Sequence, residues 1–342
     1  MRFACDDAPD VNTAEPNPTR RRTISFISIE VLIDPVPGVL SLAARFATPF
    51  KACDIIHGIL KLSGLTLNCW LMEMHSLGGN MANYPLLFRP NHHLPAVAVL
   101  QKLLNRGGAK LTPDGDFGPK TQQAVINFQR ARSLQPDGVV GVETWPRVAA
   151  SADLAILDCV DVFDPLLLED TETPLRRVGG HPSVIGGTCN GVEQAVTMIS
   201  AASRGNVFLL RFHGHGAPGV AGVSFGRGDT PGAWDELADI DTDTLDATLP
   251  MLSRLRGIFG PYGCVQFMHC ETGRGPKGYL LLSKIADALR VPATAAVNDQ
   301  AGLGSGNLPF GYTGPTVTAV PHRQTFARWA QNLPDFAGLS AA

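Results

Sequence analysis

The chain has 342 residues, of which 44% are hydrophobic and 17% charged, and its 28 basic and 31 acidic side chains give a formal net charge of −3. This composition is typical of a folded protein long enough for two domains, and it excludes fibrous, coiled-coil and wholly disordered classes. The charge balance provides no basic surplus for binding nucleic acid. The sequence contains no run of 18 or more apolar residues, so no transmembrane segment is predicted.

Residues 1–90 show no sustained helical or strand period, so the sequence assigns them no fold. Three arginines at positions 20–22 precede the apolar segment from Thr23 to Leu42, an order that resembles a twin-arginine export signal. Two acidic residues and two prolines interrupt that segment, which is atypical of such a signal. Met81 lies just before the first well-patterned segment, and a start of translation at this methionine is one hypothesis.

Residues 91–150 are the best-patterned part of the chain and carry a net charge of +3. Apolar residues at helical spacing predict a helix from Leu94 to Leu104, which Gly107 and Gly108 end. A second helix begins at Pro119, where a proline suits the first helical position. A third, short helix is expected over Val142 to Val148.

This region also repeats itself at an interval of 23 residues. The pattern Asp-Gly-x-Phe-Gly-x-x-Thr at 114–121 returns as Asp-Gly-x-Val-Gly-x-x-Thr at 137–144. In such a turn the aspartate accepts backbone N–H bonds, the glycine takes a positive φ, and the apolar residue joins the core. Each repeat is therefore predicted to be a fixed turn before a helix.

The elements LQ–LLN, DGDFGPKT, AVINFQ and DGVVGVETW stand here in the order found in the small helical peptidoglycan-binding module of bacterial cell-wall hydrolases, which this region resembles. The resemblance implies a three-helix domain that binds cell-wall glycopeptide. Phe128 and Trp145 are expected in its core. The ligand contacts are expected at the first turn, from Asp114, Gly115, Asp116, Phe117 and Thr121.

Residues 151–342 carry a net charge of −6 and alternate between strand-like and helix-like segments. Strands are predicted at 154–157, 207–212, 264–268 and 293–297, and helices at 191–203, 242–256 and 278–290. Strands separated by helices of this length predict an α/β domain with a mostly parallel sheet. Asp241 and Asp243 precede a predicted helix and are expected to cap it or to be solvated.

Two of these predicted strands end in reactive residues. The strand VFLLRF leads into His213, Gly214, His215 and Gly216, and the strand CVQFM leads into His269 and Cys270. Ligands of a parallel sheet bind beyond the carboxyl ends of its strands, so neighbouring strands would bring a histidine and a cysteine together. A histidine can then take the thiol proton, and the thiolate can attack a carbonyl.

The stretches FLLRFHGHGAPG and CVQFMHCETGRGPKGYLLLSKIADALRVPATAAV resemble the caspase-like, CHAT-type cysteine peptidases of bacteria. The resemblance implies Cys270 as nucleophile and His215, in preference to His213, as the base. The N–H groups of Gly216 and Cys270 would stabilise the oxyanion. The sequence departs from the caspase signature around the cysteine, where Glu271 would raise the pKa of the thiol and a protonated His269 would lower it.

The fold class expected is thus a three-helix peptidoglycan-binding bundle (91–150) followed by a caspase-like α/β domain (151–342). The expected partners are peptidoglycan and a peptide or protein substrate, with no nucleic acid, no cofactor and no metal, and the expected location is at the cell wall. Two alternatives stay open. The α/β domain is an inactive recognition scaffold, or His213 and His215 bind zinc together with His269 or Cys270 in a zinc-dependent hydrolase. The seven cysteines include no CxxC pair, and the other six are expected to be bystanders.

Overall fold

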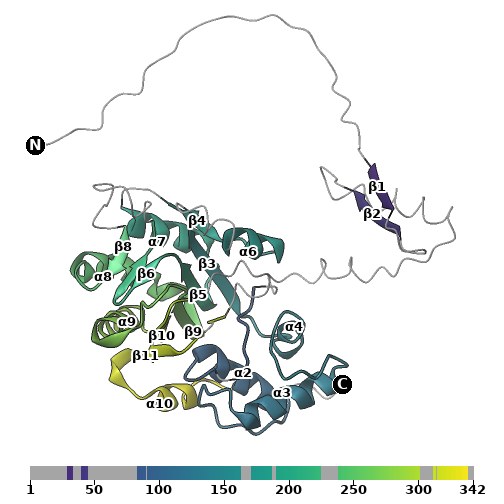
Figure 1. Ribbon diagram of the computed structural model, residues 1–342. Helices are drawn as coiled ribbons and strands as arrows, with labels where there is room; N and C mark the ends of the chain where they lie inside the picture. Colours follow the sequence, from purple (N-terminus) through teal and green to yellow (C-terminus); the bar gives the residue numbers. More distant parts are fainter. Residues whose placement is uncertain are drawn as a thin grey trace, which may run out of the picture. The chain divides into compact units, whose positions relative to one another are not determined.

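The computed structural model describes residues 29–33, 40–44, 83–89, 91–162, 171–186, 190–224, 238–300, 311–312 and 314–337. The chain divides into two compact units, Met1–Gly78 and Gly79–Ala342. In the first unit, β1 (Ile29–Ile33) and β2 (Leu40–Ala44) pair antiparallel (Figure 1). This pair lies in the stretch to which the sequence assigns no fold, while the three arginines of the export-like pattern and Met81 lie outside the described residues.

A six-stranded sheet forms the centre of the second unit, with the strand order β11-β10-β9-β5-β3-β4. Its strands pair parallel except for β11, which is antiparallel to β10. This confirms the mostly parallel sheet expected from the sequence. The strands are β3 (Ala155–Asp161), β4 (Ser183–Ile185), β5 (Val207–His213), β9 (Phe259–Phe267), β10 (Ala293–Ala296) and β11 (Thr316–Ala319).

One face of the sheet is covered by the helices that the sequence placed between the strands (Figure 1). These are α7 (Gly191–Ala202), α8 (Leu245–Ser253) with the 3-10 turn η5 (Arg254–Ile258), and α9 (Gly275–Leu289). Their apolar sides join one buried cluster with every second residue of the central strands. Phe212 of β5 and Phe267 of β9 stack in this layer with ring centroids 5.5 Å apart.

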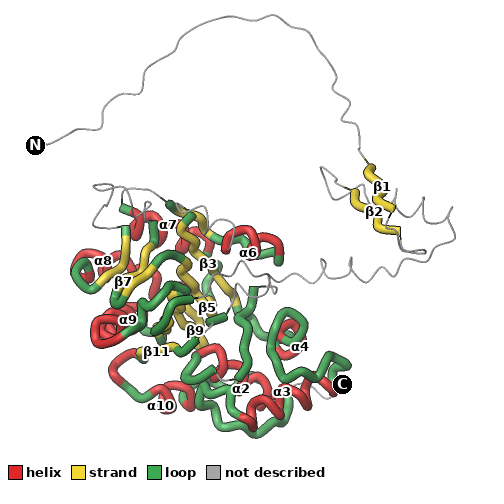
Figure 2. The backbone as a smooth tube through the Cα atoms, viewed as in Figure 1, coloured by secondary structure: helices red, strands yellow, loops and turns green. Residues whose placement is uncertain are grey.

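The other face carries the predicted peptidoglycan-binding region, whose helices are α2 (Pro95–Arg106), α3 (Pro119–Ala131) and α4 (Trp145–Val148). The short helix α10 (Phe326–Gln331) packs with them (Figure 2). Ten of the twelve residues of α2 are buried. The buried cluster of this face continues from α2 and Trp145 to Phe208 of β5 and Cys264 of β9. The module and the α/β region therefore share one core inside a single compact unit.

Residues 83–89, which precede the expected start of the module at 91, belong to this packing. Tyr84 stacks on Trp145 at 4.9 Å between ring centroids, and Leu87 forms a backbone bridge with Val140. The Trp145 indole nitrogen donates to the carbonyl of Pro85 at 2.6 Å. Trp145 is fully buried, as expected, whereas Phe128 is only half-buried.

A row of polar residues crosses the sheet on the face that α2 covers. Cross-strand partners in register form it, and its members are Asp158, Arg211, Gln266, Thr294 and Thr318. At one end of the row, Asn83 donates to Asp158 at 2.8 Å and accepts from Arg211 at 2.8 Å. At the other end, Thr318 donates to the carbonyl of His93 at 2.8 Å. Hydrogen bonds at both ends of the row thus connect the sheet to the segment that leads into the module.

Smaller elements complete the fold. A three-stranded sheet, β6 (Gly216–Ala217), β7 (Val220–Gly222) and β8 (Asp239–Asp241), follows β5 directly. Asp241, which was expected to cap α8 or to be solvated, accepts from the backbone N–H of Thr244 at 2.9 Å and so forms a turn before α8, whose N-cap residue is Thr244. The remaining elements are α6 (Thr173–Arg177) and the 3-10 turn η7 (Pro321–Arg323).

Candidate functional site

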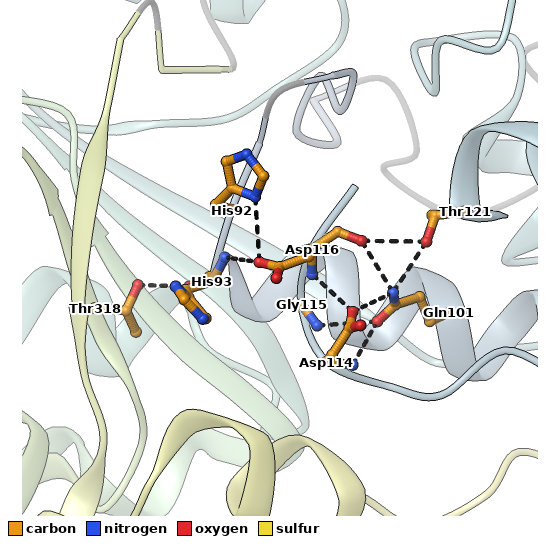
Figure 3. A network of polar contacts seen from close by, with 8 residues as sticks. All are labelled: His92, His93, Gln101, Asp114, Gly115, Asp116, Thr121 and Thr318. Carbon is orange, nitrogen blue, oxygen red and sulfur yellow. Dashed lines mark hydrogen bonds and ion pairs between the residues drawn. The ribbon is translucent and has the colours of Figure 1, made fainter. Parts of the chain in front are cut away.

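The first Asp-Gly turn is organised by one buried amide, that of Gln101 on α2 (Figure 3). Its oxygen accepts from the backbone N–H groups of Asp114 and Gly115 at 2.9 and 3.0 Å. Its nitrogen donates to the Asp114 carboxylate at 2.7 Å, the Thr121 hydroxyl at 3.0 Å and the Asp116 carbonyl at 3.2 Å. The turn is consequently fastened to α2 and to the first turn of α3.

The second turn repeats this arrangement around Gln129 on α3. The amide nitrogen of Gln129 donates to the Asp137 carboxylate at 2.8 Å, the Val139 carbonyl at 2.9 Å and the Thr144 hydroxyl at 3.1 Å. Its oxygen accepts from the N–H of Gly138 at 2.9 Å. Gly115 and Gly138 both have a φ of +75°, so the sequence repeat is a repeat of structure.

The five residues expected to contact a ligand at the first turn lie together, but three of them, Gly115, Phe117 and Thr121, are buried. The Phe117 ring is fully buried and Thr121 is 3% exposed. A Cβ on Gly115 would overlap the ring of Phe326 from α10. Asp116 accepts from the N–H of His93 at 2.8 Å, and His92 lies 3.5 Å from the same carboxylate (Figure 3). Binding through these five side chains stays a prediction.

The second turn borders a hollow in the surface. Its lining includes Gln129, Leu134, Asp137, Val142 and Glu143. Val142 is 51% exposed, which makes it one of the large apolar side chains that reach solvent, and Asp137 and Glu143 are exposed as well.

A second candidate site lies where β5 and β9 end. The two strands are parallel neighbours, with Phe212 opposite Phe267, so the loops that follow them leave the same edge of the sheet. A Cβ on Gly216 would lie 2.7 Å from the Cys270 carbonyl oxygen. The loop that carries His215 and Gly216 thus packs directly against the loop that carries Cys270.

At this edge His215 is exposed and Cys270 is half-buried. The Sγ atom of Cys270 accepts from the backbone N–H of Gln300 at 3.3 Å. The carbonyl of His215 accepts from the N–H of Gly222 at 2.9 Å, and the Gly222 carbonyl lies 2.8 Å from Nε2 of His269. These two hydrogen bonds fix the His215 backbone to the residue that precedes Cys270.

The other candidate base, His213, has a different environment. It is 3% exposed, and its Nε2 lies 2.9 Å from a carboxylate oxygen of Asp158, which Arg211 also contacts at 2.6 Å. Burial lowers the pKa of His213, while the hydrogen bond to Asp158 opposes this change. Burial alone would raise the pKa of Asp158, but Arg211 and His213 hold that pKa below its usual range. His213 is thus a buried member of the polar row's network.

The sequence predicted that the charges of His269 and Glu271 act on the Cys270 thiol, and the structure shows the environment of both side chains. Burial lowers the pKa of His269 to about 3, so its ring is neutral near pH 7 and supplies no positive charge. The Glu271 carboxylate forms an ion pair with Arg274 at the start of α9, which offsets its negative charge. Neither His269 nor Glu271 therefore places an uncompensated charge beside the thiol.

Within the described ranges, no group of three or more His, Cys, Asp or Glu side chains is arranged to hold a metal ion. Cys159 and Cys264 are buried strand residues, and burial raises the pKa of both thiols, so they are unreactive beside the more exposed Cys270. The remaining four cysteines lie outside the described residues.

Three functional features were missed in the sequence. The clamping residues Gln101 and Gln129 each follow a leucine or phenylalanine of the quoted motifs, and this recurring glutamine could have indicated them. Asp158 ends an apolar run, which gave a weak indication of a buried acid. Gln300, whose backbone meets Cys270, lies 30 residues further along the chain in a loop, and no pattern pointed to it.

Comparison with known proteins assigns part of this chain. Residues 93–147 match the family model described as "Putative peptidoglycan binding domain". An "Uncharacterized protein in bpoA1 3'region" of Kitasatospora aureofaciens is 41% identical over 73 residues, which is 21% of this chain. The chain spans 61% of the length of that relative. No solved structure matches the chain.

The family match supports a peptidoglycan-binding domain at α2–α4 and an association with the cell wall. It ends at residue 147, before β3 begins. Among the residues that the structure describes, no helix is long and apolar enough to span a membrane.

Proposed function

We propose that this protein binds peptidoglycan through residues 91–150 and hydrolyses a peptide or amide bond with the Cys270 site of its α/β region. The binding half of this proposal is supported by the family match and by the two clamped turns. The catalytic half rests on one observation, the packing of the Gly216 loop against the Cys270 loop at the carboxyl edge of β5 and β9.

The proposed chemistry uses a thiol and an imidazole. His215 takes the proton of the Cys270 thiol, and the thiolate attacks the carbonyl carbon of the scissile bond. The N–H groups of Gly216 and Cys270 stabilise the resulting oxyanion. The leaving amine departs with the proton from His215, and water then hydrolyses the thioester to release the acid and regenerate the thiol. His213 has no role in these steps, because it is buried and its Nε2 lies beside Asp158.

The proposal is supported by the resemblance of this arrangement to the caspase-like cysteine peptidases, in which a histidine and a cysteine end neighbouring strands. The strand end of β5 carries the His-Gly pair and that of β9 carries the cysteine, followed by a glycine-containing turn and the helix α9. His215 is favoured over His213 as the base because His213 is buried with its Nε2 beside Asp158, whereas His215 is exposed on the loop that packs against the Cys270 loop.

Alkylation of the full-length protein tests the catalytic half. At pH 7 we expect iodoacetamide to modify Cys270 about tenfold faster than any other thiol, because the His215 imidazole of the proposed pair takes the thiol proton. We expect His215→Ala to remove this advantage and His322→Ala, a change at an exposed histidine elsewhere, to preserve it. Peptide mapping by mass spectrometry gives the rate at each cysteine.

Two results would count against this half of the proposal. If Cys270 reacts no faster than the other accessible thiols, or if His215→Ala leaves its rate unchanged, the two residues form no dyad and the α/β region is an inactive scaffold. Retention of the full-length protein on isolated cell-wall sacculi tests the binding half separately, because a scaffold would still be retained.

A further inference from the structure

We propose that the ligand of the peptidoglycan-binding domain occupies the hollow at the second turn, and that the part bound there is a peptide bearing a free ammonium group. This inference rests on the proposed wall binding and goes beyond it by naming a site and a chemical class. It also moves the site away from the first turn, where the sequence placed it.

The two turns are built alike, so their difference lies in what surrounds them. Each is clamped by a buried glutamine, and each aspartate accepts the N–H two residues ahead, at 2.9 Å in the first turn and 2.8 Å in the second. A difference in ligand binding therefore cannot come from the turn backbone. It must come from access and from the side chains presented to solvent.

Other parts of the same unit cover the glycine of the first turn, which is buried. Phe326 of α10 packs over Gly115, and the N–H of Leu94 donates to the Gly115 carbonyl at 3.1 Å. The Phe326 ring is in turn in edge contact with the ring of His93 at 5.5 Å. Asp335, which follows α10, also contacts α2, because it forms an ion pair with Lys102 at 2.7 Å.

At the second turn, the nearest neighbours of the glycine lie within the module itself. The atoms nearest to a Cβ on Gly138 belong to Gln122 and Ile126 of α3. Beyond the turn, the hollow opens between the end of α3 and the segment before α4. A ligand can thus reach the second turn without displacing any element described in the structure.

The side chains around the hollow favour a cationic ligand with small apolar groups. Glu143 and Asp137 place two carboxylates on its rim, and only one oxygen of Asp137 is used by the clamp. Val142 presents an alkyl surface that is 51% exposed between them. An ammonium group can pair with the carboxylates while adjacent methyl groups cover Val142. The stem peptide of peptidoglycan, with its alanines and its diamino acid, has this chemistry.

The corresponding positions in the first repeat have the opposite character. Pro119 stands where the second repeat has Val142, and Lys120 stands where it has Glu143. Both residues are exposed. A lysine there repels an ammonium group, so the repeat itself provides a matched control for the proposed site.

Binding to the full-length protein tests the proposal, with calorimetry against a synthetic stem peptide that carries a free side-chain amine. We expect Glu143→Gln to weaken binding about tenfold, Val142→Ser to weaken it about threefold, and Lys120→Gln to leave it unchanged. Acetylation of the peptide amine should weaken binding to the wild type about tenfold and have no further effect on Glu143→Gln. Thermal melting verifies that each variant is folded.

The outcomes separate this inference from the proposed function. If sacculi retain the wild type and both second-turn variants equally, the hollow is not the site. If Lys120→Gln loses as much binding as Glu143→Gln, the first turn is involved and the inference is wrong. Binding of an oligosaccharide of N-acetylated amino sugars in place of the peptide would overturn the ligand class. If sacculi do not retain the wild type, the proposed wall binding itself fails.

Discussion

A single buried histidine gives this fold a specific sensitivity to acid. His269 is fully buried, its Nε2 lies 2.8 Å from the Gly222 carbonyl, and within the described residues its Nδ1 has no hydrogen-bond partner. Its pKa falls from 6.5 to about 3 on folding. Between these values the unfolded chain binds a proton that the folded chain does not, so stability is lost as the pH falls below 6.5.

Replacing His269 by glutamine should remove this part of the pH dependence. The wild-type free energy of unfolding should decrease toward acid with a contribution from His269 of up to about 1.4 kcal/mol per pH unit. In His269→Gln the slope between pH 6.5 and 4 should be shallower by about one proton, whatever the change in absolute stability. Urea denaturation at a series of pH values measures the slope.

The exposed His322 provides the control for that experiment. His322→Gln should reproduce the wild-type slope. An unchanged slope in His269→Gln would show that the ring is charged or accessible in the folded protein, which contradicts its burial. Part of the acid sensitivity should persist in His269→Gln, because burial also lowers the pKa of His213.

At the scale of elements, the sequence predicted helices and strands well where a pattern lies within one segment. It predicted them less well where a strand is defined by pairing with a segment far along the chain. The bounds of α2 and α3 were close to those predicted, since their apolar periods and their prolines are read within one segment. The three-residue strand β4 and the four-residue strand β11 were not assigned, because so few residues show no period. The order of strands in the sheet depends on contacts between remote segments and could not be read.

The candidate sites divide in the same way. The loop residues His215 and Cys270 could be named as candidates because each follows a long apolar strand. The role of Gln101 was missed because a buried glutamine in a helix resembles any surface glutamine when only the sequence is available. Phe326, which covers the first turn, lies more than 200 residues from Gly115, and no local pattern links the two.

The clamp on the first turn should contribute strongly to stability. In Gln101→Leu the backbone N–H groups of Asp114 and Gly115 lose their acceptor inside the protein, and we expect the free energy of unfolding to fall by about 3 kcal/mol. Gln123→Leu, on the exposed side of α3, should change it by less than about 0.5 kcal/mol. Chemical denaturation compares the two. Equal effects would mean that the clamp contributes no more than a surface contact.

At the scale of the whole molecule, the module is packed into the same compact unit as the α/β region and is not an independent domain. Leu100 and Val97 of α2 lie in the same buried cluster as Leu209 of β5 and Cys264 of β9. A helix buried on nearly all sides cannot be removed from its neighbours without exposing apolar surface.

A fragment of residues 91–150 should therefore fold poorly by itself. It would expose the side of α2 that faces the sheet, and a chain of about 60 residues has little stability to spare. We expect it to melt without a cooperative transition, whereas the fragment 79–342 should melt cooperatively. Circular dichroism measures both. A sharp transition for the short fragment, with an ordered Trp145 signal in the near ultraviolet, would show that docking on the sheet is dispensable.

The shared core has a consequence for how a wall-bound protein would meet its substrate. When a flexible linker joins a catalytic domain to a binding domain, the effective concentration of the catalytic group at any one bond depends on the length of the linker. Here α2 belongs to both halves, so the offset between the second turn and Cys270 is fixed by packing. Binding at the second turn would then select the bond that is cleaved, because only bonds at that distance and orientation from the bound peptide come within reach of the thiol.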